Sequence, residues 1–167
     1  MTATDVSVVI PAYRAEATID RALDSVLTQP SLREVIVVID GDLDGTAAAV
    51  NRRRERDSRV IALLQPENQG AQKTRNAGLA LASSPLIMFL DADDYVQGPV
   101  LDGLAQAMTA VSADVGFAPM QIVREDKGKR DPIVTPHYRS AADLFHQWFV
   151  DRHYVAPCSV MWRTDYV

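Results

Sequence analysis

An unbroken apolar run that ends abruptly at acidic residues constrains this chain more than any other feature. Residues 86–90 read LIMFL, and Asp91, Asp93 and Asp94 follow directly. A short continuous apolar run of this kind is typical of a strand covered on both faces of a sheet. Carboxylates at the carboxyl end of such a strand lie at the rim where open α/β proteins bind ligands. Three like charges this close raise one another's pKa unless a cation neutralises them, so the pattern indicates a site for Mg²⁺ or Mn²⁺.

The same carboxylates have a second interpretation. An acidic loop, or a helix N-terminus capped by Asp93 or Asp94, would carry the same residues. The spacing alone leaves both interpretations open, so the rest of the chain has to decide between them.

Strand-like and helix-like segments alternate through the first two thirds of the chain. Strands are predicted over residues 6–10, 35–39, 60–64 and 86–90, and helices over residues 19–27, 46–56, 71–82 and 99–111. The first strand is expected to end at Pro11, and Pro99 is expected at the first helical position. In the third helix Ala77, Ala80 and Leu81 are expected to face inward. The alternation implies βαβ units, and so an α/β fold with a mainly parallel sheet flanked by helices.

The character of the chain changes after Asp114. Residues 115–123 are predicted to form one or two strands, 124–131 a charged turn or mobile loop, 141–150 a short helix and 159–162 a short strand. We therefore divide the chain into an α/β portion, residues 1–112, and a smaller mixed portion of the same domain, residues 113–167. Because no terminating element precedes Val167, the second portion is expected to be incomplete.

Composition excludes several classes of function. The net charge of −5 argues against nucleic-acid binding, and the arginines of residues 51–56, interrupted by Glu55, indicate the solvated face of a helix. The single Cys158 excludes an internal disulfide and most cysteine metal sites. The sequence shows no signal peptide and no run long enough to span a bilayer. A cytoplasmic or cytoplasm-facing domain is therefore expected.

The loops after the four predicted strands open on the same rim of a parallel sheet. They are Pro11-Ala12-Tyr13-Arg14, Asp40 to Gly45, Asn68-Gln69-Gly70 and Asp91-Ala92-Asp93-Asp94, with Lys73 and Arg75 just beyond the third. A nucleoside diphosphate with a metal ion would use all of them. Asp40 would accept hydrogen bonds from a base imide or a ribose hydroxyl, and Arg75 or Lys73 would meet phosphate oxygens. Tyr13 would either stack on the base or pack under its own loop.

These motifs, in this order and spacing, resemble the family-2 glycosyltransferases with the GT-A fold, from Val6 to about Trp162. The resemblance rests on VSVVIPAYRAEATIDRALDSVLTQ, on the loop from Asp40 to Thr46, on Asn68-Gln69-Gly70 with Arg75-Asn76-Ala77-Gly78, and on Leu90-Asp91-Ala92-Asp93-Asp94. It implies a nucleotide-sugar donor, with a UDP-sugar favoured, a divalent cation, Mn²⁺ or Mg²⁺, and inversion at the anomeric carbon. The acceptor would be a glycan, a lipid-linked or a small molecule in bacterial glycan or polysaccharide synthesis. Association with the inner face of the membrane and a homodimer are further expectations.

The resemblance also assigns roles to residues. Residues 1–112 would hold the donor, and residues 113–167 would face the acceptor. The donor-binding residues would be Pro11, Ala12, Tyr13, Asp40, Gly41, Lys73, Arg75, Asp91, Ala92 and Asp93. Asp91 and Asp93 would position the donor sugar and metal for catalysis. The metal ligands would be Asp93 and Asp94, with Asp93 the first choice for direct ligation.

The chain departs from the family pattern in two places. Ile39 replaces the first acid of the early acidic pair, and Asp42 replaces its serine, which leaves the base preference open. The family's catalytic base usually lies further along than Val167, and Asp143, Asp151 and Asp165 are isolated carboxylates. The alternative is therefore a catalytically incomplete module that binds nucleotide-sugar without turning it over.

Two other enzyme classes share part of the pattern. A hydrolase of the haloacid dehalogenase type would place its acidic strand first in the fold, whereas residues 86–90 are the fourth predicted strand. A nucleotidyltransferase would need a Gly- and Arg-rich loop where this chain has Pro11-Ala12-Tyr13-Arg14. On the acceptor side, Cys158, Ser159 and Trp162 stand as candidate lining residues or as core.

Overall fold

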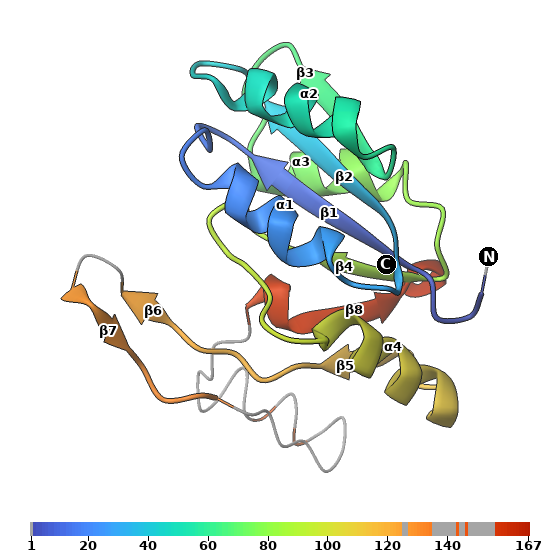
Figure 1. Cartoon of the computed structure of the whole chain (residues 1–167). Helices are drawn as coiled ribbons and strands as arrows, with labels where there is room; N and C mark the ends of the chain where they lie inside the picture. The colour runs from blue at the N-terminus through green and yellow to red at the C-terminus, as the bar shows by residue number, and fades with distance from the viewer. Residues whose placement is uncertain (1, 125–126, 135–142, 144–145, 147–155) are drawn as a thin grey trace.

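The alternating pattern becomes four strand–helix pairs in the computed structural model, which describes residues 2–124, 127–134, 143, 146 and 156–167 (Figure 1). The strands are β1 Val6–Ala12, β2 Leu32–Asp40, β3 Val60–Gln65, β4 Leu86–Phe89, β5 Val115–Phe117, β6 Val123–Arg124, β7 Lys129–Arg130 and β8 Val160–Arg163. The described helices are α1 Ile19–Leu27, α2 Thr46–Arg56, α3 Ala71–Leu79 and α4 Val100–Val111, with 3₁₀ turns at Pro157–Ser159 and Thr164–Tyr166. None of them is long and apolar enough to cross a membrane.

Six strands form one sheet in the order β3-β2-β1-β4-β8-β5. Strands β1 to β4 run parallel, and β8 is antiparallel to β4 and β5. The predicted mainly parallel sheet is therefore confirmed. The strand order reverses beside β1, since β2 lies on one side of it and β4 on the other. The loops after β1 and β4 thus flank the switch point of the sheet, where open α/β proteins bind ligands.

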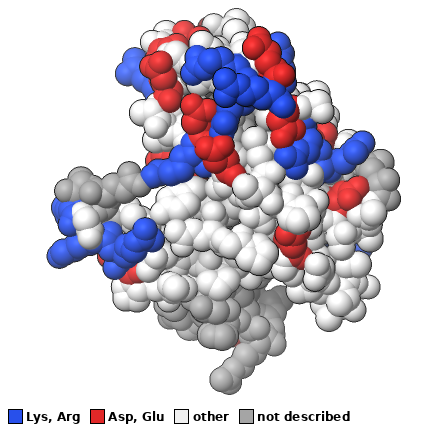
Figure 2. Space-filling model, in the orientation of Figure 1, with Lys and Arg blue, Asp and Glu red and all other residues white. Residues whose placement is uncertain are grey.

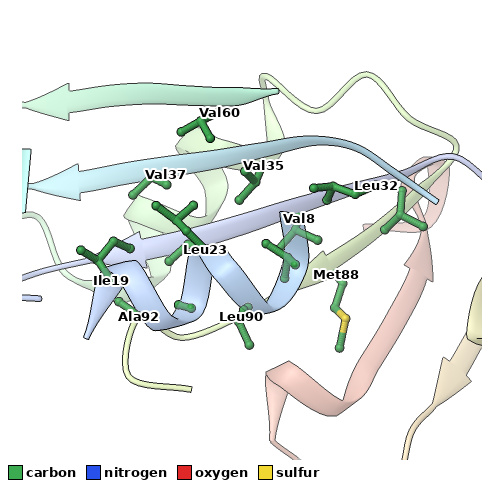
Figure 3. Packing of buried hydrophobic residues seen from close by; sticks show 14 of the residues in the cluster. Val8, Ile19, Leu23, Leu32, Val35, Val37, Val60, Met88, Leu90 and Ala92 are labelled. Atoms are coloured by element: carbon green, nitrogen blue, oxygen red, sulfur yellow. The ribbon is translucent and has the colours of Figure 1, made fainter. Parts of the chain in front are cut away.

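Alternate residues of the central strand pack into two separate cores. Val6 and Val8 of β1 lie in a core with α1, α2 and α4, whereas Val9 lies in a smaller core with α3 on the other face. Figure 3 shows the first core, with Ile19 and Leu23 of α1 against the strands. Because side chains alternate between the two faces of a strand, a strand covered on both faces is apolar along most of its length.

Helix α3 ends earlier than predicted and buries different residues. It stops at Leu79 rather than residue 82, so Ala80 and Leu81 leave the helical face and are exposed. Ala77 packs against the smaller core as expected. The fully buried positions are Thr74 and Gly78; a Cβ on Gly78 would lie 2.3 Å from Val9 Cγ1, so the glycine lets α3 approach the sheet closely.

The two prolines also sit differently from the prediction. Strand β1 continues through Pro11, which pairs in register with Val38. The Val9 carbonyl accepts a hydrogen bond from Leu90 N, so Val9 directs its backbone polar groups towards β4. Pro11 lies two residues further on and faces the same side, where the pairing with β4 has already ended. The missing N–H of Pro11 therefore costs no hydrogen bond of the sheet. Pro99 is the N-cap of α4 rather than its first residue.

The C-terminal part contributes strands to the main sheet. The expected strand at residues 159–162 is β8, and residues 115–123 hold β5 and the start of β6. Within the charged segment 124–131, Arg124 belongs to β6 and Lys129–Arg130 form β7, which pairs antiparallel with β6 (Figure 1). Gly128, directly before β7, adopts φ +58°. The helix predicted over residues 141–150 lies almost entirely outside the described residues.

The arginine-rich helix is a solvated surface, as predicted. Arg53 of α2 pairs with Asp20 and Asp24 of α1, and its three neighbouring arginines are exposed. Figure 2 shows charges of both signs mixed over this part of the molecule rather than a uniformly basic patch.

Candidate functional site

A cavity of about 440 Å³ opens at the carboxyl ends of β1, β2 and β4 and at the first turn of α3. Eight of the ten predicted donor-binding residues line it: Pro11, Ala12, Tyr13, Asp40, Arg75, Asp91, Ala92 and Asp93. The other two, Gly41 and Lys73, do not line the cavity, and neither does Asp94. Lys73 lies two residues before Arg75 on α3, about 200° around the helix, and is exposed.

Asp40 fixes the third rim loop in place. Its carboxylate, only 3% exposed, accepts hydrogen bonds from the backbone N–H groups of Gln69 (2.7 Å) and Gly70 (2.9 Å). Gly41 adopts φ +75°, and a Cβ there would lie 3.1 Å from Asn68 N. Asp40 therefore lines the cavity and holds the third rim loop, while Gly41, which does not line the cavity, lets the backbone of that loop approach closely.

A second polar network joins the first two rim loops. Thr46 Oγ1 accepts from Ala15 N at 2.8 Å and donates to Asp44 Oδ1, while Asp44 Oδ2 accepts from Glu16 N. The bond from the Thr46 hydroxyl holds the pKa of Asp44 below its ordinary value. The acidic residues of this loop thus bind main chain and hydroxyl groups within the protein.

The late aspartates form a tight turn at the end of β4. Asp94 N donates to Asp91 O at 2.9 Å, which buries Ala92 and leaves Asp93 exposed at the cavity. Asp91 accepts a hydrogen bond from Arg75 Nη2 within an ion pair. Arg75 and Asp91, both predicted to bind the donor, therefore line the same cavity but are bonded to each other.

Asp94 does not line this cavity, and its carboxyl is hydrogen-bonded to Cys158, in the 3₁₀ turn just before β8. Burial raises the pKa of its carboxyl, the hydrogen bond from the Cys158 thiol opposes the rise, and the charges of Asp93 and Asp91 add to it. Burial and the bond to Asp94 raise the pKa of Cys158 as well, so the thiol stays protonated and donates. The expected mutual repulsion of the aspartates is present at Asp94, although burial is the larger cause.

The aspartates do not converge on one point. Among the described residues, no three His, Cys, Asp or Glu side chains are grouped closely enough to hold a metal ion. Asp91 is paired with Arg75, and Asp94 is bonded to Cys158. Of the three aspartates, Asp93 therefore lines the cavity without an ion pair to the residues that the structure describes.

A larger cavity, about 790 Å³, lies at the opposite end of the sheet, beside the amino end of β4. Its lining combines apolar groups with the hydroxyls of Ser83, Ser84 and Thr164 and the Arg163–Asp165 ion pair. None of the residues predicted from the sequence to bind a donor or a metal lines it.

Comparison with known proteins identifies the family. The family model described as Glycosyl transferase family 2 matches residues 7–166. The chain belongs to glycosyltransferase family 2. Among curated relatives, the succinoglycan biosynthesis protein ExoU of Rhizobium meliloti is 39% identical over 92 residues, which are 55% of this chain and 27% of that protein. TuaG of Bacillus subtilis, named for teichuronic acid biosynthesis, is 30% identical over 130 residues, 77% of this chain and 52% of that protein.

Solved structures share the fold of this family-2 chain. Staphylococcus aureus TarS in complex with UDP-GlcNAc aligns with a TM-score of 0.76 at 24% identity, covering 96% of this chain and 45% of that one. The mannosyltransferase PcManGT from Pyrobaculum calidifontis, in complex with GDP-Man and Mn²⁺, aligns with a TM-score of 0.60 at 25% identity, covering 66% and 34%. The GT-A α/β fold is thereby confirmed, and the chain spans about half or less of the length of these proteins.

In this family-2 chain the cavity also contains residues that sequence reasoning did not assign. Arg14, Thr18, Asn68, Gly70 and Thr74 line it beside the predicted residues. Arg14, Asn68 and Gly70 belong to rim loops that the strand pattern had already located, so their position was the available signal. Thr18, directly before the predicted helix 19–27, and Thr74, inside the predicted helix 71–82, carried no signal, because threonine is ordinary at both positions.

Proposed function

We propose that the 440 Å³ cavity binds a nucleoside-diphosphate sugar and that this chain supplies the donor-binding part of an inverting glycosyltransferase. The observation that carries the proposal is the convergence of Asp40, Arg75 and Asp93, from two strand ends and a helix, on one cavity. Its volume suits a small-molecule ligand. Its position beside the switch point between β1 and β4 supports the same role.

Arg75 and the N-terminus of α3 support a diphosphate subsite. The guanidinium fork suits phosphate oxygens, and the first turn of α3, through Ala71 and Thr74, lines the cavity with the positive end of the helix dipole. Arg75 is paired with Asp91 in this structure. We infer that the donor phosphates share this arginine with Asp91 or take it over.

Tyr13 and Asp40 support a nucleoside subsite. Tyr13 is 43% exposed at the cavity and offers an aromatic face to a base. Each Asp40 oxygen accepts one backbone hydrogen bond and keeps a lone pair for a ribose or base donor. UDP is the first nucleotide to test, although the TarS and PcManGT structures, described with UDP-GlcNAc and GDP-Man, show that one fold accommodates different bases.

A divalent cation, Mn²⁺ or Mg²⁺, fits this site if the protein and the donor phosphates coordinate it together, rather than protein side chains alone. Mg²⁺ is commonly held by one or two carboxylates together with substrate phosphates and water, and Asp93 supplies one such carboxylate. Asp94 would be a second ligand on release from Cys158. When bound, the cation offsets the negative charge that develops on the departing diphosphate.

The remaining chemistry is a single displacement at the anomeric carbon. Arg75 stabilises the departing diphosphate, while an acceptor hydroxyl attacks from the opposite face and a base takes its proton. Asp40, Asp91 and Asp93 of the lining already have other roles in this proposal, so we assign the base to none of them. The acceptor is a glycan or its lipid-linked precursor in bacterial polysaccharide synthesis, the process for which ExoU and TuaG are named, reached from the cytoplasmic side.

Calorimetric titration of UDP, GDP, CDP and dTDP, with Mn²⁺ and then with excess chelator, tests the proposal. Binding of one nucleotide that depends on Mn²⁺ is the expected result. Absence of binding to all four in both conditions would overturn the proposal. Release of free sugar from the matching nucleotide-sugar then separates an enzyme from a module that only binds the donor.

A further inference from the structure

Helix α1 carries a stripe of three polar side chains at intervals of four residues: Arg21, Ser25 and Gln29. Residues four apart lie one above the other on a helix, so the three side chains share a face, and we call them the α1 stripe. Gln29 follows the end of α1 but continues this face, and it is only 6% exposed despite being polar. Such burial indicates a bonding partner rather than solvent.

Each member of the stripe bonds the main chain of residues 93–98. Arg21 Nη2 donates to the Asp93 carbonyl at 2.9 Å, Ser25 Oγ accepts from Val96 N at 3.2 Å, and Gln29 Nε2 donates to the Gly98 carbonyl at 2.9 Å. The Arg21 guanidinium also lies over the Tyr95 ring, 4.7 Å from its centroid. The bonds join parts of the chain about 70 residues apart and meet every second or third residue of the segment.

The segment depends on these bonds for its conformation. Residues 93–98 belong to no helix and no strand, so their backbone groups lack the partners that regular structure would supply. Asp93 is the first residue of the segment, and its own carbonyl is the atom that Arg21 holds. Asp93 is also exposed and lines the cavity.

We propose that the α1 stripe positions Asp93, and thereby sets how tightly the cavity takes up a nucleoside diphosphate together with its cation. The inference rests on the proposed function and adds three positioning residues to it. None of the three touches the ligand in this account; they act through the backbone that carries Asp93. Residues that support a ligand of a metal commonly change metal affinity by about 10- to 100-fold when they are altered, and a loss of this order is expected here.

A matched arginine distinguishes positioning from plain stability. Arg53 of α2 also bonds α1, through Asp20 and Asp24, and its side chain is 21% exposed. None of these three residues lines the cavity. Arg53→Ala therefore removes an interhelical arginine of similar kind without touching residues 93–98.

The test measures nucleotide affinity with Mn²⁺ and with chelator for the wild-type chain and for Arg21→Ala, Arg21→Lys, Ser25→Ala, Gln29→Ala and Arg53→Ala. The nucleotide is the one that the wild-type chain binds most tightly among UDP, GDP, CDP and dTDP. Arg21→Ala and Gln29→Ala should weaken Mn²⁺-dependent binding by about 10- to 100-fold while changing metal-free binding by less than about threefold. Arg21→Lys should recover part of the loss, because lysine still donates to the Asp93 carbonyl. Arg53→Ala should bind like the wild type.

Urea unfolding of every variant shows which of them are folded, and Ser25→Ala, which removes a single acceptor, keeps the test available if the larger changes unfold the chain. Wild-type affinity in Arg21→Ala, or an equal loss in Arg53→Ala, would overturn the positioning role alone. Absence of nucleotide binding by the wild-type chain would overturn the proposed function and this inference together.

Discussion

At the carboxyl ends of β1, β2 and β4, a cavity of about 440 Å³ is lined by Asp40, Arg75, Asp91 and Asp93. At the amino end of β4 a cavity of about 790 Å³ is lined by apolar groups, hydroxyls and one ion pair, Arg163 with Asp165. The larger cavity is thus the poorer in charged groups. Both cavities lie at ends of the same sheet, so they differ because different residues of the chain line each end.

Polar groups at the amino end bond mainly to one another. Glu34 Oε1 accepts from Ser7 Oγ (2.6 Å), Ser83 N (2.7 Å) and Ser83 Oγ (2.9 Å), and Ser7 Oγ accepts from Ser84 N (3.1 Å). This network closes the turn that leads into β4. At the carboxyl end Asp93 instead faces the cavity from a turn held by its backbone.

The contrast teaches that strand direction locates the chemistry better than cavity size does. In a parallel sheet the loops that follow the strands all begin at the same end, so loops far apart in sequence bring their side chains together there. The opposite end receives the chain from the helices and serves mainly to hold the fold. Four substitutions test this division, in order of expected effect.

The largest effect is expected at Asp93. Asp93→Ala removes the carboxylate that faces the cavity and should abolish the Mn²⁺-dependent part of nucleotide binding, because the cation loses its protein ligand. Calorimetry with and without chelator measures it. Asp165→Ala, the matched change at the larger cavity, should leave nucleotide binding unaltered. If Asp93→Ala also kept the wild-type affinity, Asp93 would not belong to the binding site.

A smaller loss is expected at Arg75. Hydrogen bonds to charged groups contribute about 1.5–3 kcal/mol, so Arg75→Ala should weaken nucleotide binding by roughly 10- to 100-fold with or without the cation. Arg163→Ala is the control, since it removes an arginine from the larger cavity. If the Arg163 variant loses as much affinity as the Arg75 variant, the division between the two ends is wrong.

At the amino end the expected loss is in stability alone. Ser7→Ala leaves the buried Ser84 N–H without an acceptor and removes one of the donors to Glu34 Oε1. The free energy of unfolding should therefore fall by about 1–3 kcal/mol. Urea unfolding measures this loss, and nucleotide affinity of the folded variant should match that of the wild type. A changed affinity would mean that the two ends are coupled.

The smallest effect is expected at Asp57, just before β3. Arg59 hydrogen-bonds this carboxylate and lowers its pKa from 3.8 to about 2, so the folded state favours the charged form. The resulting stabilisation is complete above about pH 4 and is lost as the pH falls through about 2. As a surface ion pair it is expected to contribute no more than about 1 kcal/mol. Asp57→Asn should therefore be less stable than the wild type at pH 7 and equally stable near pH 2; a constant difference in urea unfolding would contradict the pairing.

Much of this arrangement could be predicted from the sequence, because it depends on local pattern. The apolar run before Asp91 defines β4 and marks its carboxyl end, and the same argument places Asp40 at the carboxyl end of β2. Since parallel strands share one rim, Asp40, Arg75 and Asp93 could be expected around one site, and all three line the cavity.

What the sequence could not provide depends on long-range contacts. No local pattern indicates that β8 enters the sheet between β4 and β5, or that Arg75 pairs with Asp91. The bond from Arg21 to the Asp93 carbonyl involves main chain, which carries no residue identity. Leu81 was misplaced for a simpler reason, because the helical period was extended past the end of α3 at Leu79.

The most direct test of the central claim is to locate the bound nucleotide and cation on the folded chain. Mn²⁺ is paramagnetic, so a nuclear magnetic resonance spectrum of the amide groups, recorded with nucleotide and a trace of Mn²⁺, shows broadening near the metal. Broadening of residues 91–94 and 12–14, with sharp signals from residues 83–84 and 112–113, is the predicted result. Broadening around the 790 Å³ cavity, or uniform sharp signals with nucleotide present, would contradict the assignment of the donor site to the carboxyl end of the sheet.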